Sequence, residues 1–148
     1  MRLPHWYQLA YRIFPAVRIG ECEAGRHGAY SRRRRRRVDA AIQLAHAAGL
    51  EVFVTSRSED KRARVLQLGA DAAFETGARL PRKADAVIES VGAATWSHSV
   101  KSVRPGGTIA ICGATTGDQP GAELTRIFFQ DIRVQGNTMA PVRISHVC

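Results

Sequence analysis

Residues 40–135 alternate between helical apolar spacing and short, continuously apolar runs. Apolar residues recur on one helix face between positions 41 and 48, and Gly49 supplies a stop. The pattern predicts strands at 51–55, 72–74, 86–89, 108–112 and 132–135, and further helices at 56–68, 96–103 and 122–130. Continuously apolar strands that alternate with helices are typical of a parallel sheet with helices on both faces.

Local features of these elements lead to three smaller predictions. Ser56 with Glu59 fits a capping box at the start of the second helix, and Ser58 is a competing N-cap. Phe128 and Phe129 lie in a helical pattern and are predicted to belong to the core. The Pro-Gly-Gly sequence at 105–107 predicts a turn.

The first 39 residues do not follow the alternating pattern. Residues 3–14 fit an amphipathic helix, whereas 20–31 have no apolar run or period and are predicted to form a loop. Arg32–Arg37 is a run of six arginines directly before the first predicted helix. Six like charges repel one another and oppose the positive end of a helix dipole. We therefore expect a divergent segment at 1–39, made of a helix followed by an irregular arginine-rich stretch, then an incomplete domain at 40–139 and a divergent tail at 140–148.

Composition and charge exclude several classes. The 148 residues, 45% of them hydrophobic, suit one globular domain. Six of the nine net positive charges belong to the arginine run, so the remaining chain has no basic surface expected for specific nucleic-acid binding. The three cysteines are far apart, without metal-ligand spacing, which suits a reducing compartment such as the cytoplasm. No apolar run reaches the roughly 20 residues of a membrane span.

Five segments in order resemble the cofactor domain of the medium-chain dehydrogenase/reductase family, which includes zinc-type alcohol dehydrogenases and quinone oxidoreductases. They are AAIQLAHAAG, EVFVTSRSEDKRARVLQLGADAAFE, ADAVIESVGAATW, SVRPGGTIAICGAT and FFQDIRVQGNTM, and they span residues 40–139. The resemblance implies a Rossmann-like sheet with strand order 3-2-1-4-5-6. It also implies an NAD(P)H-dependent oxidoreductase that transfers hydride to a small molecule, either a quinone or an activated double bond.

The resemblance implies a position for the cofactor ribose at the end of the predicted strand 51–55. A carboxylate there would bind the 2′-hydroxyl of NAD, whereas this sequence has Ser56 and Arg57. A hydroxyl and a guanidinium suit a 2′-phosphate, and Lys61 one helical turn later adds charge. This favours NADP(H) over NAD(H). The alternative, that Arg57 and Lys61 are a solvated helix face, stands on an equal footing.

The same resemblance implies residues beside the nicotinamide. They follow three predicted strands and are Ser90, Val91, Gly92, Cys112, Gly113, Ala114 and Asn137. For Gly92 and Gly113 ordinary turn geometry is the competing explanation. Cys112 is expected to be a buried apolar residue rather than a nucleophile. No catalytic acid or base is assigned.

Two parts of the family pattern are not recognisable. A first strand and a G-x-G-x-x-G loop should precede the helix at residue 40, but Gly25 and Gly28 are too far upstream and have no recognisable strand before them. We therefore expect the first strand to be missing or replaced, which would leave strands 51–55 and 86–89 without a shared neighbour and impair cofactor binding. A catalytic domain and zinc ligands are not recognised either, so no zinc is expected.

A frameshift explains the arginine run. A series of GGC glycine codons, read two bases out of step, becomes a series of CGG arginine codons. At the other end of the chain, the family commonly continues with Met-Gly-Thr-Arg-Glu. A one-base deletion in codons for that sequence gives the Met-Ala-Pro-Val-Arg found from Met139. One alternative function is therefore a truncated remnant with little activity. Another is a non-specific polyanion binder acting through Arg32–Arg37. The sequence does not decide the oligomeric state.

Overall fold

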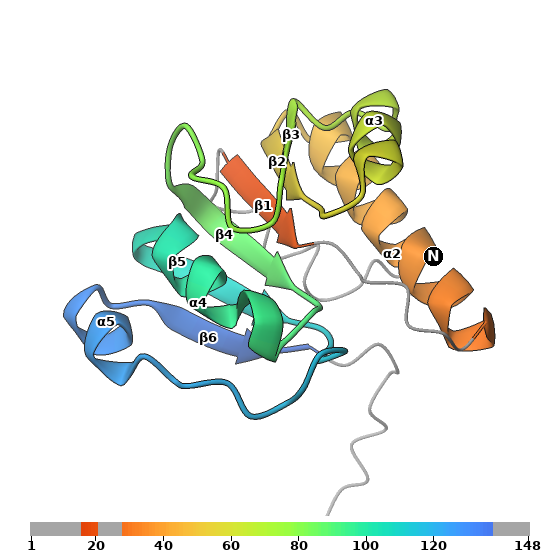
Figure 1. Cartoon of the computed structure of the whole chain (residues 1–148). Helices are drawn as coiled ribbons and strands as arrows, with labels where there is room; N and C mark the ends of the chain where they lie inside the picture. Colours follow the sequence, from red (N-terminus) through yellow and green to blue (C-terminus); the bar gives the residue numbers. More distant parts are fainter. Residues whose placement is uncertain (1–15, 21–27, 138–148) are drawn as a thin grey trace, which may run out of the picture.

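The computed structural model describes residues 16–20 and 28–137 as a six-stranded parallel sheet between helices (Figure 1). The strands are β1 (Ala16–Gly20), β2 (Glu51–Thr55), β3 (Ala72–Phe74), β4 (Ala84–Glu89), β5 (Val103–Ile111) and β6 (Arg133–Gly136). The helices are α2 (Gly28–Ala47), α3 (Glu59–Gln67), α4 (Ala93–Ser102) and α5 (Leu124–Phe129). The strand order β3-β2-β1-β4-β5-β6 confirms the predicted Rossmann-like α/β fold.

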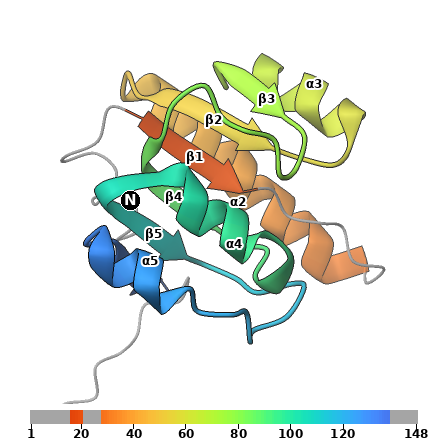
Figure 2. The same ribbon diagram turned by 60° about the vertical axis from the view of Figure 1, so that its left-hand side comes forward.

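Two apolar clusters cover the two faces of the sheet. One joins α2, β2 and α3 through Ile42, Val54 and Val65. The other joins α4 to β4 and β5 through Val100, Val87 and Ile109, with Ile127 of α5 at its margin. Figures 1 and 2 show α2 and α3 on one side of the sheet and α4 and α5 on the other. No helix in the described part of the chain is long and apolar enough to cross a membrane.

The expectation of a missing first strand is wrong. β1 lies between β2 and β4 and pairs in parallel with both, for example Val17 with Val52 and with Ala86. β2 and β4 therefore do share a neighbour that satisfies their backbone groups. The sequence pattern missed β1 because Arg18 interrupts its apolar residues, whereas central parallel strands are usually continuously apolar.

The expectation of an irregular arginine stretch is also wrong. α2 begins at Gly28 and includes all of Arg32–Arg37 before it continues into the predicted helix. Arginine has high intrinsic helix propensity, and propensity summed over a long segment outweighs the charge repulsion that the sequence argument used. The second half of α2 is anchored because Ala41, Ile42 and Ala45 pack on the sheet.

Two local predictions are also corrected. Ser58 takes the N-cap position of α3 without a side-chain cap hydrogen bond, and the Ser56 hydroxyl instead accepts from the Ser58 amide at 3.1 Å. No capping box therefore joins Ser56 to Glu59. Phe128 and Phe129 are exposed, at 63% and 75%, because α5 presents them away from the sheet.

The remaining predicted elements have close counterparts. The turn at 105–107 is a register irregularity inside β5, where pairing with β4 passes from Val103 directly to Thr108. The predicted helix at 3–14, Gly25 and the tail at 140–148 lie outside the described residues. The domain division at residues 39 and 139 stays a prediction, although β1 shows that the sheet uses residues before 40.

Candidate functional site

The carboxyl ends of the strands meet along one edge of the sheet. Register pairs Gly20 with Thr55 between β1 and β2, and Ile111 with both Glu89 and Gly136 across β4, β5 and β6. The chain order reverses at β1, since β2 lies on one side of it and β4 on the other. In open parallel sheets, ligands bind outside the carboxyl ends at such a switch point. All ten predicted site residues lie on this edge or in the first turn of α3 behind it.

The turn after β4 is locked to the loop after β5. The Thr116 amide and hydroxyl both donate to the Val91 carbonyl, at 2.8 and 2.9 Å, and the Ala93 amide donates to the Gly117 carbonyl at 3.0 Å. Gly92 has φ 96°, and a Cβ there would lie 2.3 Å from the Gly117 oxygen. The contact between the two loops is therefore sufficient to explain why position 92 is a glycine, without a cofactor close to it.

Glu89 is the functional candidate that the sequence argument missed. Its side chain is 1% exposed, and Oε1 accepts hydrogen bonds from the amides of Val91 and Gly92 at 2.8 and 3.1 Å. The hydroxyls of Thr95 and Ser99 also donate to this carboxylate. Four donors stabilise a buried carboxylate and hold the turn at the start of α4. The available signal was a single acid that ends the apolar run Ala-Val-Ile-Glu.

The ends of β5 and β6 lie beside this turn. The Cys112 amide donates to the Glu89 carbonyl at 2.8 Å, and the Cys112 Sγ lies 3.5 Å from the same oxygen. Cys112 is half-buried rather than buried as expected. The Asn137 amide donates to the Ile111 carbonyl at 2.8 Å, and its side chain turns back to the Gln135 carbonyl. Ser90, Val91, Gly92, Cys112, Gly113, Ala114 and Asn137 thus form one continuous group.

The end of β2 forms a second group on the other side of β1. Ser56 is buried and its amide donates to the Phe74 carbonyl at 2.9 Å. Arg57 is exposed and Lys61 is half-buried in the first turn of α3. Arg62, which the sequence argument did not single out, donates from Nη1 to the Ser56 carbonyl at 2.7 Å. The structure therefore separates the predicted residues into two groups, one on each side of the switch point.

The positions of β1 and α2 differ from those expected on either side of a dinucleotide-binding loop. β1 ends at Gly20 and α2 begins at Gly28, so a strand does precede Gly25 and Gly28, contrary to the sequence argument. Figures 1 and 2 show the first turns of α2 projecting past the carboxyl edge of the sheet. Its 20 residues measure about 30 Å at 1.5 Å each, whereas the 5 residues of β1 span about 17 Å. A pyrophosphate bound at the end of β1 would lie away from the helix N-terminus that usually holds it.

No group of three or more His, Cys, Asp or Glu side chains in the described part of the chain has the arrangement of a metal site. The described residues therefore do not fit a zinc ion. The expectation that the chain lacks zinc ligands stays a prediction.

Comparison with known proteins gives a consistent result. A family model described as zinc-binding dehydrogenase matches residues 39–145. An NAD-dependent alcohol dehydrogenase is 28% identical with a TM-score of 0.71, covering 90% of this chain and 38% of that one. A thermostable alcohol dehydrogenase from Pyrobaculum aerophilum is 29% identical with a TM-score of 0.68, covering 89% and 38%. No curated protein matches the chain.

A more distant structure shares the fold alone. The yhdH oxidoreductase from Salmonella enterica, solved in complex with NADP, is 20% identical with a TM-score of 0.65, covering 82% of this chain and 36% of that one. The chain thus spans less than two fifths of the length of these structures.

Proposed function

The chain belongs to the zinc-binding dehydrogenase family, and on this premise we propose that it is the cofactor-binding part of an NADP(H)-dependent oxidoreductase. The proposed reaction is hydride transfer to a small molecule, either a quinone or an activated double bond. The nicotinamide would supply the hydride, and the protein would bind and orient it. The cytoplasm is the proposed compartment, since the sequence has an odd number of cysteines, far apart in the chain.

The observation that carries the proposal is the pair Ser56 and Arg57 at the carboxyl end of β2, next to the switch point. A ribose bound at this strand end would meet the exposed Arg57 guanidinium rather than a carboxylate, because the Ser56 hydroxyl is buried and hydrogen-bonded to the Ser58 amide. Arg57 is exposed, so its guanidinium can reach a 2′-phosphate, and Lys61 adds a second positive charge one turn away. Both features favour NADP(H) over NAD(H).

The nicotinamide would lie on the other side of β1. The buried turn Ser90, Val91 and Gly92 would form the floor of this position, with its backbone groups held by hydrogen bonds within the protein, and Cys112, Gly113, Ala114 and Asn137 at the neighbouring strand ends would lie around it. Glu89 would act as a positioning residue, because its carboxylate holds the turn from behind. No described side chain is proposed as a catalytic acid or base, and the proposal uses no zinc chemistry.

The pyrophosphate is the part of the cofactor that these residues do not fit. Because α2 begins beyond the edge of the sheet, the usual amides of a helix N-terminus are not next to β1. We expect NADP(H) binding that is weaker than in an intact domain and sensitive to salt. A remnant with little activity is the alternative form of this proposal.

Titration of the full chain with NADPH and with NADH tests the proposal. Nicotinamide fluorescence should report a saturable NADPH complex at low salt and a weaker NADH complex, and a quinone assay should then be run with NADPH. Equal affinity for the two cofactors would overturn the NADP preference. Absence of any saturable binding would leave the remnant as the better description.

A second candidate function rests on α2. All six residues of Arg32–Arg37 lie in α2, whose first turns project beyond the sheet. Phosphate contacts from such a helix would be independent of sequence and weakened by salt. Replacing the six arginines by alanine should abolish RNA binding in a filter assay, and unchanged RNA binding would eliminate this candidate.

A further inference from the structure

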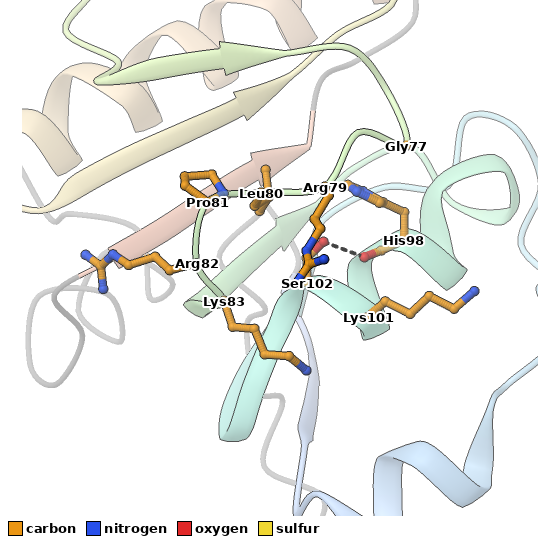
Figure 3. Close-up of a pocket in the computed structure, with 9 residues that line it drawn as sticks. All are labelled: Gly77, Arg79, Leu80, Pro81, Arg82, Lys83, His98, Lys101 and Ser102. Atoms are coloured by element: carbon orange, nitrogen blue, oxygen red, sulfur yellow. Dashed lines mark hydrogen bonds between the residues drawn. The ribbon is translucent and has the colours of Figure 1, made fainter.

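A cavity of about 330 Å³ lies between α4 and the segment that crosses from β3 to β4 (Figure 3). Gly77 and residues 79–83 line one wall, and His98, Lys101 and Ser102 of α4 line the other. Lys83 directly precedes β4, and Ser102 ends α4, so the cavity lies toward the amino end of β4. It is therefore separate from the cofactor residues at the carboxyl ends of the strands.

The cavity is held open by fixed contacts. The Ala78 carbonyl can only accept, so the His98 Nε2 donates to it at 2.8 Å and attaches the crossing segment to α4. Leu80 in the same segment is buried. Arg82 forms an ion pair with Glu51, and Figure 3 shows it pointing away from the other lining residues. A ligand would therefore enter a site that needs little ordering on binding.

The charges around the cavity are all of one sign. Arg79, Lys83 and Lys101 line it, and no acidic residue does. Among the described residues, none of these three cations takes part in an ion pair. Three like charges around one hollow repel one another, and a bound anion would relieve that repulsion.

We propose that this cavity binds a small organic phosphate monoester. The planar Arg79 guanidinium matches two phosphate oxygens, and the lysines act as flexible point charges. Leu80 and Pro81 add an apolar wall that inorganic phosphate would not use, whereas the carbon skeleton of an ester would. The volume lies at the lower end of the range for small-molecule pockets.

The test follows amide chemical shifts of the full chain during titration with glycerol 3-phosphate. Saturable shifts are expected in residues 77–83 and 98–102. Glycerol, which lacks the phosphate, should produce none. Inorganic phosphate should bind more weakly than the ester. Equal or tighter binding of inorganic phosphate, or shifts confined to Arg32–Arg37, would overturn the proposal.

Two variants that each remove one positive charge distinguish binding in the cavity from general electrostatic attraction to the protein surface. Arg79→Ala should raise the Kd for glycerol 3-phosphate about tenfold or more, because a charge-assisted pair is lost. Arg133→Ala removes an exposed arginine on β6 and should change the Kd less than about twofold. Equal effects of the two variants would refute the site. The outcome is independent of the cofactor proposal, since Arg79→Ala should leave NADPH affinity unchanged.

Discussion

The carboxylate of Glu89 accepts a hydrogen bond from the Thr95 hydroxyl at 2.9 Å, which ties the end of β4 to the first turn of α4. The same carboxylate accepts the Val91 and Gly92 amides, so one buried side chain organises the whole turn. A buried charge is tolerated here because each of its oxygens has donors. The hydrogen bonds that hold the turn after β4 are therefore made by a buried carboxylate beneath the candidate site.

Glu89→Ala should lower the free energy of unfolding by about 3–5 kcal/mol, because two amides and two hydroxyls lose their buried acceptor. Glu89→Gln should lower the free energy of unfolding by less, since the amide oxygen of glutamine can still accept hydrogen bonds. Urea unfolding followed by circular dichroism measures both. The exposed Glu75→Ala is the control, and a loss for Glu89→Ala no larger than the loss for Glu75→Ala would contradict the network.

Gly92→Ala should destabilise the fold by more than about 2 kcal/mol. The new Cβ would lie 2.3 Å from the Gly117 oxygen, and φ 96° is unfavourable for alanine. Gly121→Ala is a matched control, because a Cβ there meets nothing within 4 Å. Thermal unfolding of both variants provides the comparison. If the two substitutions had the same effect, the close contact between the loops after β4 and β5 would not exist in solution.

Arg57→Ala should weaken NADPH binding about tenfold while changing NADH binding less than about twofold, since only NADPH has the 2′-phosphate. Arg57→Asp should go further and favour NADH, because a carboxylate can accept from the 2′-hydroxyl. Fluorescence titration at one fixed salt concentration measures both ratios. A parallel loss for the two cofactors would show that Arg57 contributes only general charge.

Phe129→Ser should cost less than about 1 kcal/mol of stability, because the ring is 75% exposed. It should also reduce aggregation, since Phe128 and Phe129 form an exposed apolar pair with ring centroids 4.4 Å apart. Phe53→Ala, at a residue 2% exposed, should cost about 3–5 kcal/mol. Urea unfolding and light scattering provide the two readouts. A loss at Phe129 similar to that at Phe53 would mean that α5 is packed in solution.

Much of the fold could be predicted because its signals are local. The strands at Glu51–Thr55 and Ala72–Phe74 have the predicted bounds, and β4, β5 and β6 overlap the predicted strands but have different ends. Apolar periodicity and turn residues suffice for such elements, since each depends on its own residues and on burial of one face. The position of the candidate site came from the resemblance to a known family, and it stays a prediction.

Two of the errors, at β1 and at Phe128 and Phe129, share one physical cause, which is that contacts between distant residues were decisive. β1 contains an arginine and is a strand because β2 and β4 provide hydrogen-bond partners on both sides. Phe128 and Phe129 have a helical apolar pattern, but packing leaves them outside the core. Neither outcome is encoded in the periodicity of the segment itself.

The sequence by itself determined the alternation of strands and helices, the parallel sheet and the residue types at each strand end, because short-range patterns and strand connectivity specify them. Only the tertiary structure decided that Ala16–Gly20 completes the sheet, that the Glu89 carboxylate holds the turn after β4, and that Arg79, Lys83 and Lys101 surround one cavity. Each of these depends on residues far apart in the chain, whose proximity arises from packing.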